Sequence, residues 1–152
     1  MLAVPDIRLA TPPDARPIAE LSRDYIEHGL GWSWTRARVL GAIRDPSSNV
    51  IVVHQRERLA GFGIMQYADD CAHLALLAVH PTRRHLGIGA RLVAWLEQSA
   101  QAAGISHVRL EARADNRSAV AFYQRLGFNP SGKISGYYEG SIDAVQLEKR
   151  LA

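Results

Sequence analysis

The sequence predicts an α+β domain built on a mixed β-sheet. Residues 72–126 read as a strand, a helix, a second strand and a second helix, with apolar residues recurring at the spacing of each element. A right-handed crossover through the first helix makes those two strands parallel. Residues 50–67 instead read as two strands joined by a short turn, which is a hairpin with antiparallel strands. The sheet is therefore expected to contain both kinds of pairing.

The first half of the chain carries a strand, two helices and the hairpin. Pro13 suits the first turn of a helix, and Ile18, Leu21 and Tyr25 follow it at helical spacing. The pair Asp45-Pro46 ends a second helix, because the residue before a proline disfavours the helical conformation. We expect a strand at 7–9, helices at 12–28 and 35–44, and hairpin strands at 50–55 and 59–67.

The second half repeats strand and helix and then returns to strands. Gly104 and Gly127 each suit the end of a helix, where glycine adopts the left-handed conformation at low cost. Asp115 or Asn116 suits the N-cap of the second of these helices. We expect strands at 72–79 and 107–112, helices at 87–103 and 116–126, and one or two strands within 134–147. Without a linker or repeat, residues 1–152 are expected to form one domain.

Composition narrows the class of protein. With 152 residues and 47% apolar content, the chain can bury an ordinary globular core. Its net charge of +3 comes with scattered arginines rather than a basic run, so a nucleic-acid partner is not expected. The sequence contains neither an apolar run of about 18 residues nor a basic leader followed by an apolar stretch. We therefore expect a cytoplasmic protein without a membrane partner.

The cysteine and the histidines do not form a metal framework. Cys71 is the single cysteine, which excludes an internal disulfide, and it reads as a packing residue at a strand start. His73, His80 and His107 lack metal-ligand spacing and read as surface or strand positions. No metal is expected.

The segment Arg84-His85-Leu86-Gly87-Ile88-Gly89-Ala90 joins the strand at 72–79 to the next helix. Its glycines remove Cβ atoms, so backbone N–H groups can converge on an anion at the helix N-terminus, where the helix dipole favours negative charge. The segment lacks the third glycine of a dinucleotide fingerprint and the Lys-Ser or Lys-Thr pair of a P-loop. It predicts a cradle for a pyrophosphate group, to which Arg84 adds charge. The alternative is a sterically convenient turn.

A second motif lies further along the chain. The residues from Asn116 to Phe128 follow the pattern N-x-x-A-x-x-F-Y-x-x-x-G-F, and those from Arg84 to Gly89 follow R-x-x-G-x-G. In this order and at this spacing, the two motifs resemble the GNAT superfamily of N-acetyltransferases. The resemblance implies a six- to seven-stranded, mostly antiparallel sheet whose parallel fourth and fifth strands splay apart, flanked by about four helices.

The resemblance also implies acetyl-CoA as the cosubstrate. In the superfamily the pantetheine arm lies between the splayed strands, against backbone groups that a bulge in the fourth strand leaves unpaired. Those groups here belong to Leu77 and Val79, with Ala78 between them. The cradle from Arg84 to Ala90 would hold the pyrophosphate, and Asn116 would contact the pantetheine arm as well as cap its helix.

Two residues are the candidates for catalysis. Transfer of an acetyl group to a primary amine requires the amine to lose a proton and the departing thiolate to gain one. By the resemblance, Tyr123 is the acid and lies near the sulfur, although it also suits packing. Glu111 is the base, acting through ordered water, although it also suits a strand salt bridge with Arg109 or Arg113. Glu139 is the reserve base.

The acceptor is less closely defined. The spacing of Glu111, Asn116 and Tyr123 is similar to that of the ribosomal-protein N-terminal alanine acetyltransferases, the RimI type. The pair Tyr137-Tyr138 is similar to tyrosines that hold the acceptor there, although Ile134-Ser135-Gly136 replaces the basic residues that often precede them. The resemblance thus implies acetyl transfer to a protein N-terminus or to a small amine. A non-catalytic acyl-CoA-binding domain and an RNA-linked acceptor are the alternatives.

The segment between the first two helices carries Trp32 and Trp34 among glycines. Their rings suit either stacking on an acceptor or pinning the second helix to the sheet. Superfamily members are often dimers, which leaves a homodimer open.

Overall fold

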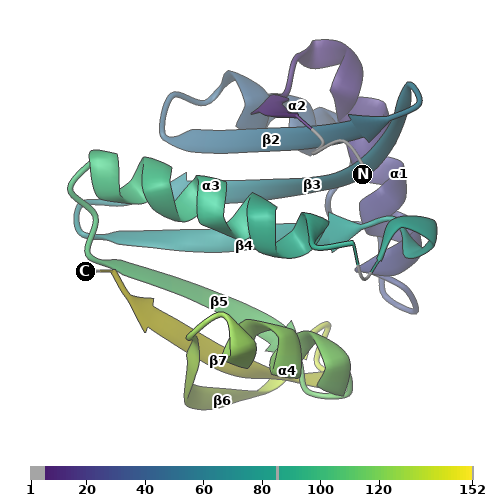
Figure 1. The fold of residues 1–152 in the computed structure, drawn as a ribbon. Helices are drawn as coiled ribbons and strands as arrows, with labels where there is room; N and C mark the ends of the chain where they lie inside the picture. Colours follow the sequence, from purple (N-terminus) through teal and green to yellow (C-terminus); the bar gives the residue numbers. More distant parts are fainter. Residues whose placement is uncertain (1–5, 85, 152) are drawn as a thin grey trace.

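The structure is a computed structural model that describes residues 6–84 and 86–151. The described residues form seven strands in one sheet, in the order β1-β2-β3-β4-β5-β7-β6 (Figure 1). Neighbouring strands are antiparallel except β4 and β5, which are parallel. The mixed sheet expected from the sequence is thereby confirmed. The strands are β1 (Ile7–Leu9), β2 (Ser48–Gln55), β3 (Arg58–Tyr67), β4 (Cys71–Val79), β5 (His107–Arg113), β6 (Asn129–Tyr138) and β7 (Ile142–Arg150).

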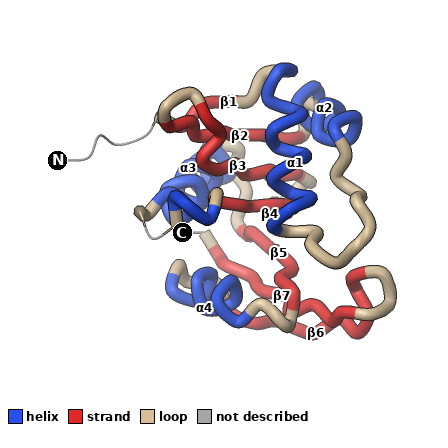
Figure 2. The backbone as a smooth tube through the Cα atoms, turned by 90° about the vertical axis from the view of Figure 1, so that its right-hand side faces the viewer, coloured by secondary structure: helices blue, strands red, loops and turns tan. Residues whose placement is uncertain are grey.

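Four α-helices of the described chain cover both faces of the sheet. The α1–α2 face carries α1 (Ala15–Tyr25) and α2 (Arg36–Arg44), and the α3–α4 face carries α3 (Ile88–Ala102) and α4 (Arg117–Arg125) (Figure 2). Each face has its own buried core. Within the described residues, no helix has the length and apolar character needed to cross a membrane.

The observed elements differ from the expected ones only near their ends. The helix expected at 12–28 begins as a 3₁₀ turn at Pro12–Asp14 and ends at Tyr25. Asn116 is the N-cap of α4, because its Oδ1 accepts the N–H of Ala119 at 3.1 Å. The tail, where one or two strands were expected within 134–147, forms two strands that begin earlier, at Asn129, and end later, at Arg150.

The pairing of β4 with β5 is short. Cys71–His73 lie beside His107–Arg109, and beyond them β4 pairs with β3 while β5 pairs with β7. A register shift between Ile64 and Met65 of β3 leaves Ala75 of β4 as the extra residue of a bulge. Because a bulge bends its strand and interrupts the ladder, β4 turns away from β5 (Figure 1). The two parallel strands therefore diverge, as the resemblance implies.

Candidate active site

The cradle segment forms the turn between β4 and α3. Gly87 is the N-cap of α3 and has φ +79°, a left-handed conformation that L side chains rarely adopt. A Cβ at Gly87 would meet nothing within 4 Å, so the space beside it is open. The first-turn N–H groups of α3 have no acceptor within the helix. Together with the positive end of the helix dipole, these amides suit an anion.

The side chains of the cradle divide between packing and solvent. Ile88 is buried in the core, whereas Leu86 is exposed. Arg84 folds back towards β4, where its Nε donates a hydrogen bond to the Val79 carbonyl at 3.2 Å. What the cradle offers an anion is therefore mainly backbone, with the charge of Arg84 beside it. His85 lies outside the described residues.

Gly89 has a packing role that the sequence does not reveal. A Cβ at this position would lie 3.0 Å from Cζ of Phe122 in α4, closer than ordinary contact, and 3.6 Å from Cγ2 of Val79. Gly89 therefore allows the first turn of α3 to pack against α4. Ala90, the next residue, is half-buried.

Leu77, Ala78 and Val79 lie beyond the last residue pair between β4 and β5. They pair with β3 on one side. On the other side, which faces β5, their backbone takes no part in strand pairing. Leu77 and Val79 pack against the core of the α3–α4 face, and Ala78 belongs to the core of the other face. All three residues therefore pack in a core, and on their edge towards β5 the Val79 carbonyl accepts Nε of Arg84.

Tyr123 is a buried residue of α4. Its ring makes edge contacts with Phe122 and Phe128, at centroid distances of 5.1 and 5.8 Å. Burial, and secondarily the nearby Tyr138 hydroxyl, raise the pKa of the Tyr123 phenol well above its ordinary value. The phenol therefore keeps its proton at neutral pH.

Glu111 is the centre of a polar cluster on the α1–α2 face. Its Oε1 lies 2.6 Å from Nε2 of His73 and accepts the Tyr137 hydroxyl at 3.2 Å, while Oε2 accepts Nη1 of Arg109 at 3.3 Å. Burial alone would raise the pKa of Glu111, but the hydrogen bond and charge of His73, with smaller effects of Tyr137 and Arg109, hold it below its ordinary value. Glu111 is therefore ionised at neutral pH and acts only as an acceptor, which puts the His73 proton on Nε2.

Glu111 and Tyr123 approach from opposite faces of the sheet. Leu110 and Ala112 point into the core of the α3–α4 face, so Glu111 between them points to the other face. Tyr123 belongs to the α3–α4 core itself. Glu111 lies two residues past Arg109, the last residue of β5 that pairs with β4, and the helix that carries Tyr123, α4, packs against β5.

His73 is the member of this cluster that the sequence did not indicate. It reads there only as a surface or strand position, because nothing in a single sequence gives the register of β4 on β5. The structure pairs His73 with Arg109 in parallel register, two residues before Glu111. Of the two arginines considered as partners of Glu111, Arg109 makes the contact and Arg113 pairs with Asp115 instead.

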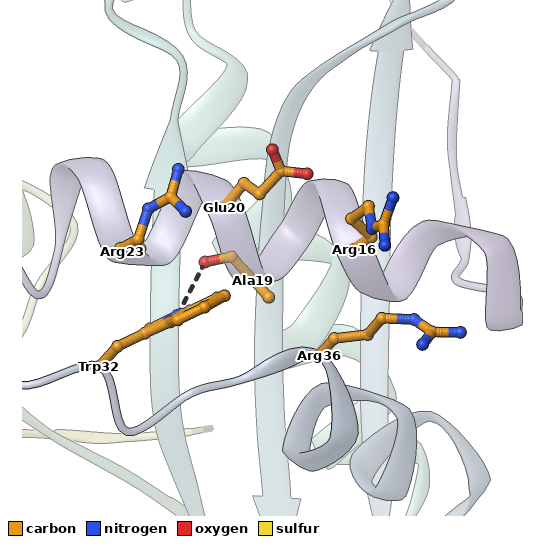
Figure 3. A pocket seen from close by; sticks show the side chains of 6 residues that line it. All are labelled: Arg16, Ala19, Glu20, Arg23, Trp32 and Arg36. Atoms are coloured by element: carbon orange, nitrogen blue, oxygen red, sulfur yellow. Dashed lines mark hydrogen bonds between the residues drawn. The ribbon is translucent and has the colours of Figure 1, made fainter.

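The two tryptophans of the α1–α2 loop have separate roles. Trp34 is buried in the core under α1 and α2, with the guanidinium of Arg38 3.8 Å from its ring centre, which supports the pinning interpretation. Trp32 lies along α1 and donates a hydrogen bond from Nε1 to the Ala19 carbonyl at 3.2 Å (Figure 3). Its ring borders a surface cavity of about 340 Å³ that shares no lining residue with the Glu111 cluster. The residues that line this cavity are Arg16, Ala19, Glu20, Arg23, Trp32 and Arg36.

Two further features border the cluster. Glu139, the reserve base, instead accepts the Gly31 N–H at 2.7 Å. A cavity of about 240 Å³ adjoins His73 and Arg109 and is also lined by Gln66, Tyr67 and Cys71. This cavity thus borders two partners of Glu111, although Glu111 itself is not among the residues that line it.

The comparison with protein families identifies the class. Residues 7–128 match the acetyltransferase (GNAT) family, a stretch that contains both the cradle and the motif from Asn116 to Phe128. The chain belongs to this family, which confirms the resemblance drawn from the two motifs.

Individual relatives agree with this membership. The [ribosomal protein bS18]-alanine N-acetyltransferase of Escherichia coli strain K12 is 35% identical over 94 residues, which cover 60% of this chain and 64% of that enzyme. The match thus spans less than two thirds of the relative's length. The crystal structure of the ribosomal-protein-S18-alanine N-acetyltransferase from Escherichia coli superimposes with a TM-score of 0.82 at 25% identity, covering 98% of this chain and 95% of that one. Ard1 from Thermoplasma volcanium gives 0.86 at 25% identity, covering 99% of both chains.

Proposed function

We propose that the protein is an acetyl-CoA-dependent N-acetyltransferase that transfers the acetyl group directly to the amine of a protein N-terminus. The observation that carries the proposal is the placement of Glu111 and Tyr123 on opposite faces of the sheet, where β4 and β5 diverge. A base on one face can serve an incoming amine while an acid on the other serves a departing thiolate. Family membership and the Escherichia coli relative support this class of reaction.

The described residues fit acetyl-CoA. The turn from Arg84 to Ala90 would hold the pyrophosphate, because Gly87 leaves open space beside the free amides of α3. The backbone edge at 77–79 that faces β5 would pair with the pantetheine arm, with Arg84 giving up its hydrogen bond to the Val79 carbonyl. Asn116 would add a side-chain contact. When bound, acetyl-CoA supplies an activated thioester, so the protein needs no nucleophilic side chain of its own.

Glu111 would receive the proton of the acceptor amine through a water. The cavity beside its partners His73 and Arg109 exceeds the roughly 30 Å³ that one water occupies in the liquid, so there is room for water next to the cluster. A carboxylate whose pKa is lowered is a weak base, which suits an α-amino group with a pKa of about 7.7–8.0 better than a lysine at about 10.4. This difference favours a protein N-terminus. Once deprotonated, the nitrogen bonds to the acetyl carbon as the carbon–sulfur bond breaks.

Tyr123 would supply the proton that the departing sulfur gains. Its raised pKa keeps the phenol protonated until that moment. The same burial destabilises a thiolate anion and raises its proton affinity, which helps the proton to leave the phenol. The nitrogen thus loses one proton to Glu111 before the attack and a second to water as the amide forms. Tyr123 regains a proton from solvent after the thiol has left.

The decisive measurement is thiol release from acetyl-CoA with two pools of acceptors. One pool contains short peptides with free N-termini, and the other contains small amines. The control is the same peptides with blocked N-termini and a free lysine side chain. Turnover that disappears on blocking is expected. Turnover with small amines alone would refute the N-terminal acceptor, and acetyl-CoA binding without turnover in either pool would refute the enzyme.

A further inference from the structure

We propose that Glu139 and Arg113 clasp the loop at residues 26–35 to the sheet and position it as a wall of the acceptor site. The inference rests on the proposed function, because it assigns positioning residues to the same site. Both residues contact backbone atoms of this loop. Arg113 lies on β5 with Glu111, and Glu139 directly follows β6, which carries Tyr137.

The loop is internally ordered by a buried carboxylate. Glu27 accepts hydrogen bonds from the Ser22 hydroxyl, from the N–H of Ser33 at 2.8 Å and from the N–H of Trp34. Trp34 is in turn buried in the core under α1 and α2. Glu27 and Trp34 therefore fix the inner side of the loop to α1 and α2, and the contacts of its outer side fix it to β5 and to the β6–β7 turn.

The first such contact joins the loop to the β6–β7 turn. Oε1 of Glu139 accepts the N–H of Gly31 at 2.7 Å, across 108 positions of sequence. Gly31 is suited to this contact, because a Cβ there would overlap Oε1 of Glu139. Glu139 itself has φ +55°, a conformation that few residues other than glycine adopt. Tyr137 and Tyr138 immediately precede it, and Tyr137 donates to Glu111.

The second contact joins the loop to β5. Nη1 of Arg113 donates to the His28 carbonyl at 2.7 Å, and the same guanidinium forms a bidentate pair with Asp115 at 3.1 Å. This pair raises the pKa of Arg113 and holds the guanidinium in one orientation. Arg113 lies two residues after Glu111 on the same strand, so both side chains point to the α1–α2 face. The segment of β5 from Glu111 to Arg113 therefore sets the distance between the loop and the candidate base.

The clasp predicts a selective kinetic defect. In Glu139→Ala, the KM for the acceptor should rise about tenfold while kcat and the KM for acetyl-CoA stay within twofold, because the cosubstrate contacts lie at α3 and β4. Glu139→Gln keeps an acceptor oxygen and should restore most of the loss. Glu57→Ala is the matched control, since Glu57 is also an exposed glutamate with positive φ, +65°, in the β2–β3 turn. An acceptor KM that is unchanged in Glu139→Ala, or equally raised in Glu57→Ala, overturns the proposal.

A double-mutant cycle tests the contact itself. Gly31→Ala acts by displacing the Glu139 carboxylate, so it should raise the acceptor KM in the wild-type background and add little in the Glu139→Ala background. Additive effects would show that the two residues act separately and would overturn the clasp.

Amide exchange supplies a readout that does not need turnover. The Gly31 N–H should exchange faster in Glu139→Ala than in wild type, Glu139→Gln or Glu57→Ala. Equal exchange rates overturn the clasp. If peptides are not acetylated at all, the proposed N-terminal acceptor is refuted. The clasp is then tested by the exchange rate of the Gly31 N–H and by the KM of whichever amine is turned over.

Discussion

Replacing His73 with alanine tests the polar cluster around Glu111. The two side chains meet at 2.6 Å, and their exposed fractions are 22% for His73 and 5% for Glu111. A hydrogen bond to a charged group contributes about 1.5–3 kcal/mol, and the partial exposure of His73 places this one at the lower end. Loss of this hydrogen bond disfavours the ionised carboxyl, so the pKa of Glu111 should rise in His73→Ala.

The sign of the pH effect follows from the direction of the shift. Because the pKa of Glu111 is lowered in the folded protein, its ionisation stabilises the fold above the ordinary pKa of a glutamate, and this stabilisation is lost as the pH falls through the lowered value. In His73→Ala the folded pKa lies closer to the ordinary one, so less of this stabilisation is present at neutral pH and its loss is complete at a higher pH. The two proteins should therefore differ in stability at neutral pH and converge in acid, where both carboxyls are protonated.

The carboxyl ¹³C shift of Glu111, followed by NMR against pH, measures this directly. His73→Gln keeps a donor without the charge and should give an intermediate pKa. His80→Ala is the control, since the His80 imidazole contacts Thr82 instead. Superimposable titrations of wild type and His73→Ala would refute the role given to His73.

Three further changes test the other parts of the site. Tyr123→Phe should lower kcat by about 10²-fold, the low end for loss of a general acid, while calorimetry finds acetyl-CoA affinity unchanged; full turnover would remove Tyr123 from the mechanism. Gly89→Ala should lower Tm, because its Cβ would press on Cζ of Phe122. Adding Phe122→Leu to this variant should recover part of the loss. A loss of Tm that Phe122→Leu does not reduce would argue against this contact. Gly87→Val should weaken acetyl-CoA binding at least tenfold, whereas Gly104→Val should not, although both glycines have open space and φ near +80°. Equal loss in both variants would mean that general strain, rather than the cradle, explains the effect.

The sequence by itself determined most of the elements and the motifs of the site. Alternation and helical spacing are local properties, so the strands at 72–79 and 107–112 and the helices after them could be read directly. The cap at Asn116 was readable for the same reason, since a side-chain cap is satisfied within a few residues. The left-handed conformation of Gly87, just before α3, was seen only in the structure. The match to the GNAT family rests on these local patterns.

What the tertiary structure decided is how separate elements meet. The parallel register of β4 on β5 puts His73 beside Glu111, and this register depends on the hydrophobic cores of both faces rather than on either strand alone. The need for glycine at position 89 comes from Phe122 in another helix, and that at position 31 from Glu139 in a distant turn. Such contacts join residues tens of positions apart, so their physical cause is packing between elements, which no local pattern in the sequence contains.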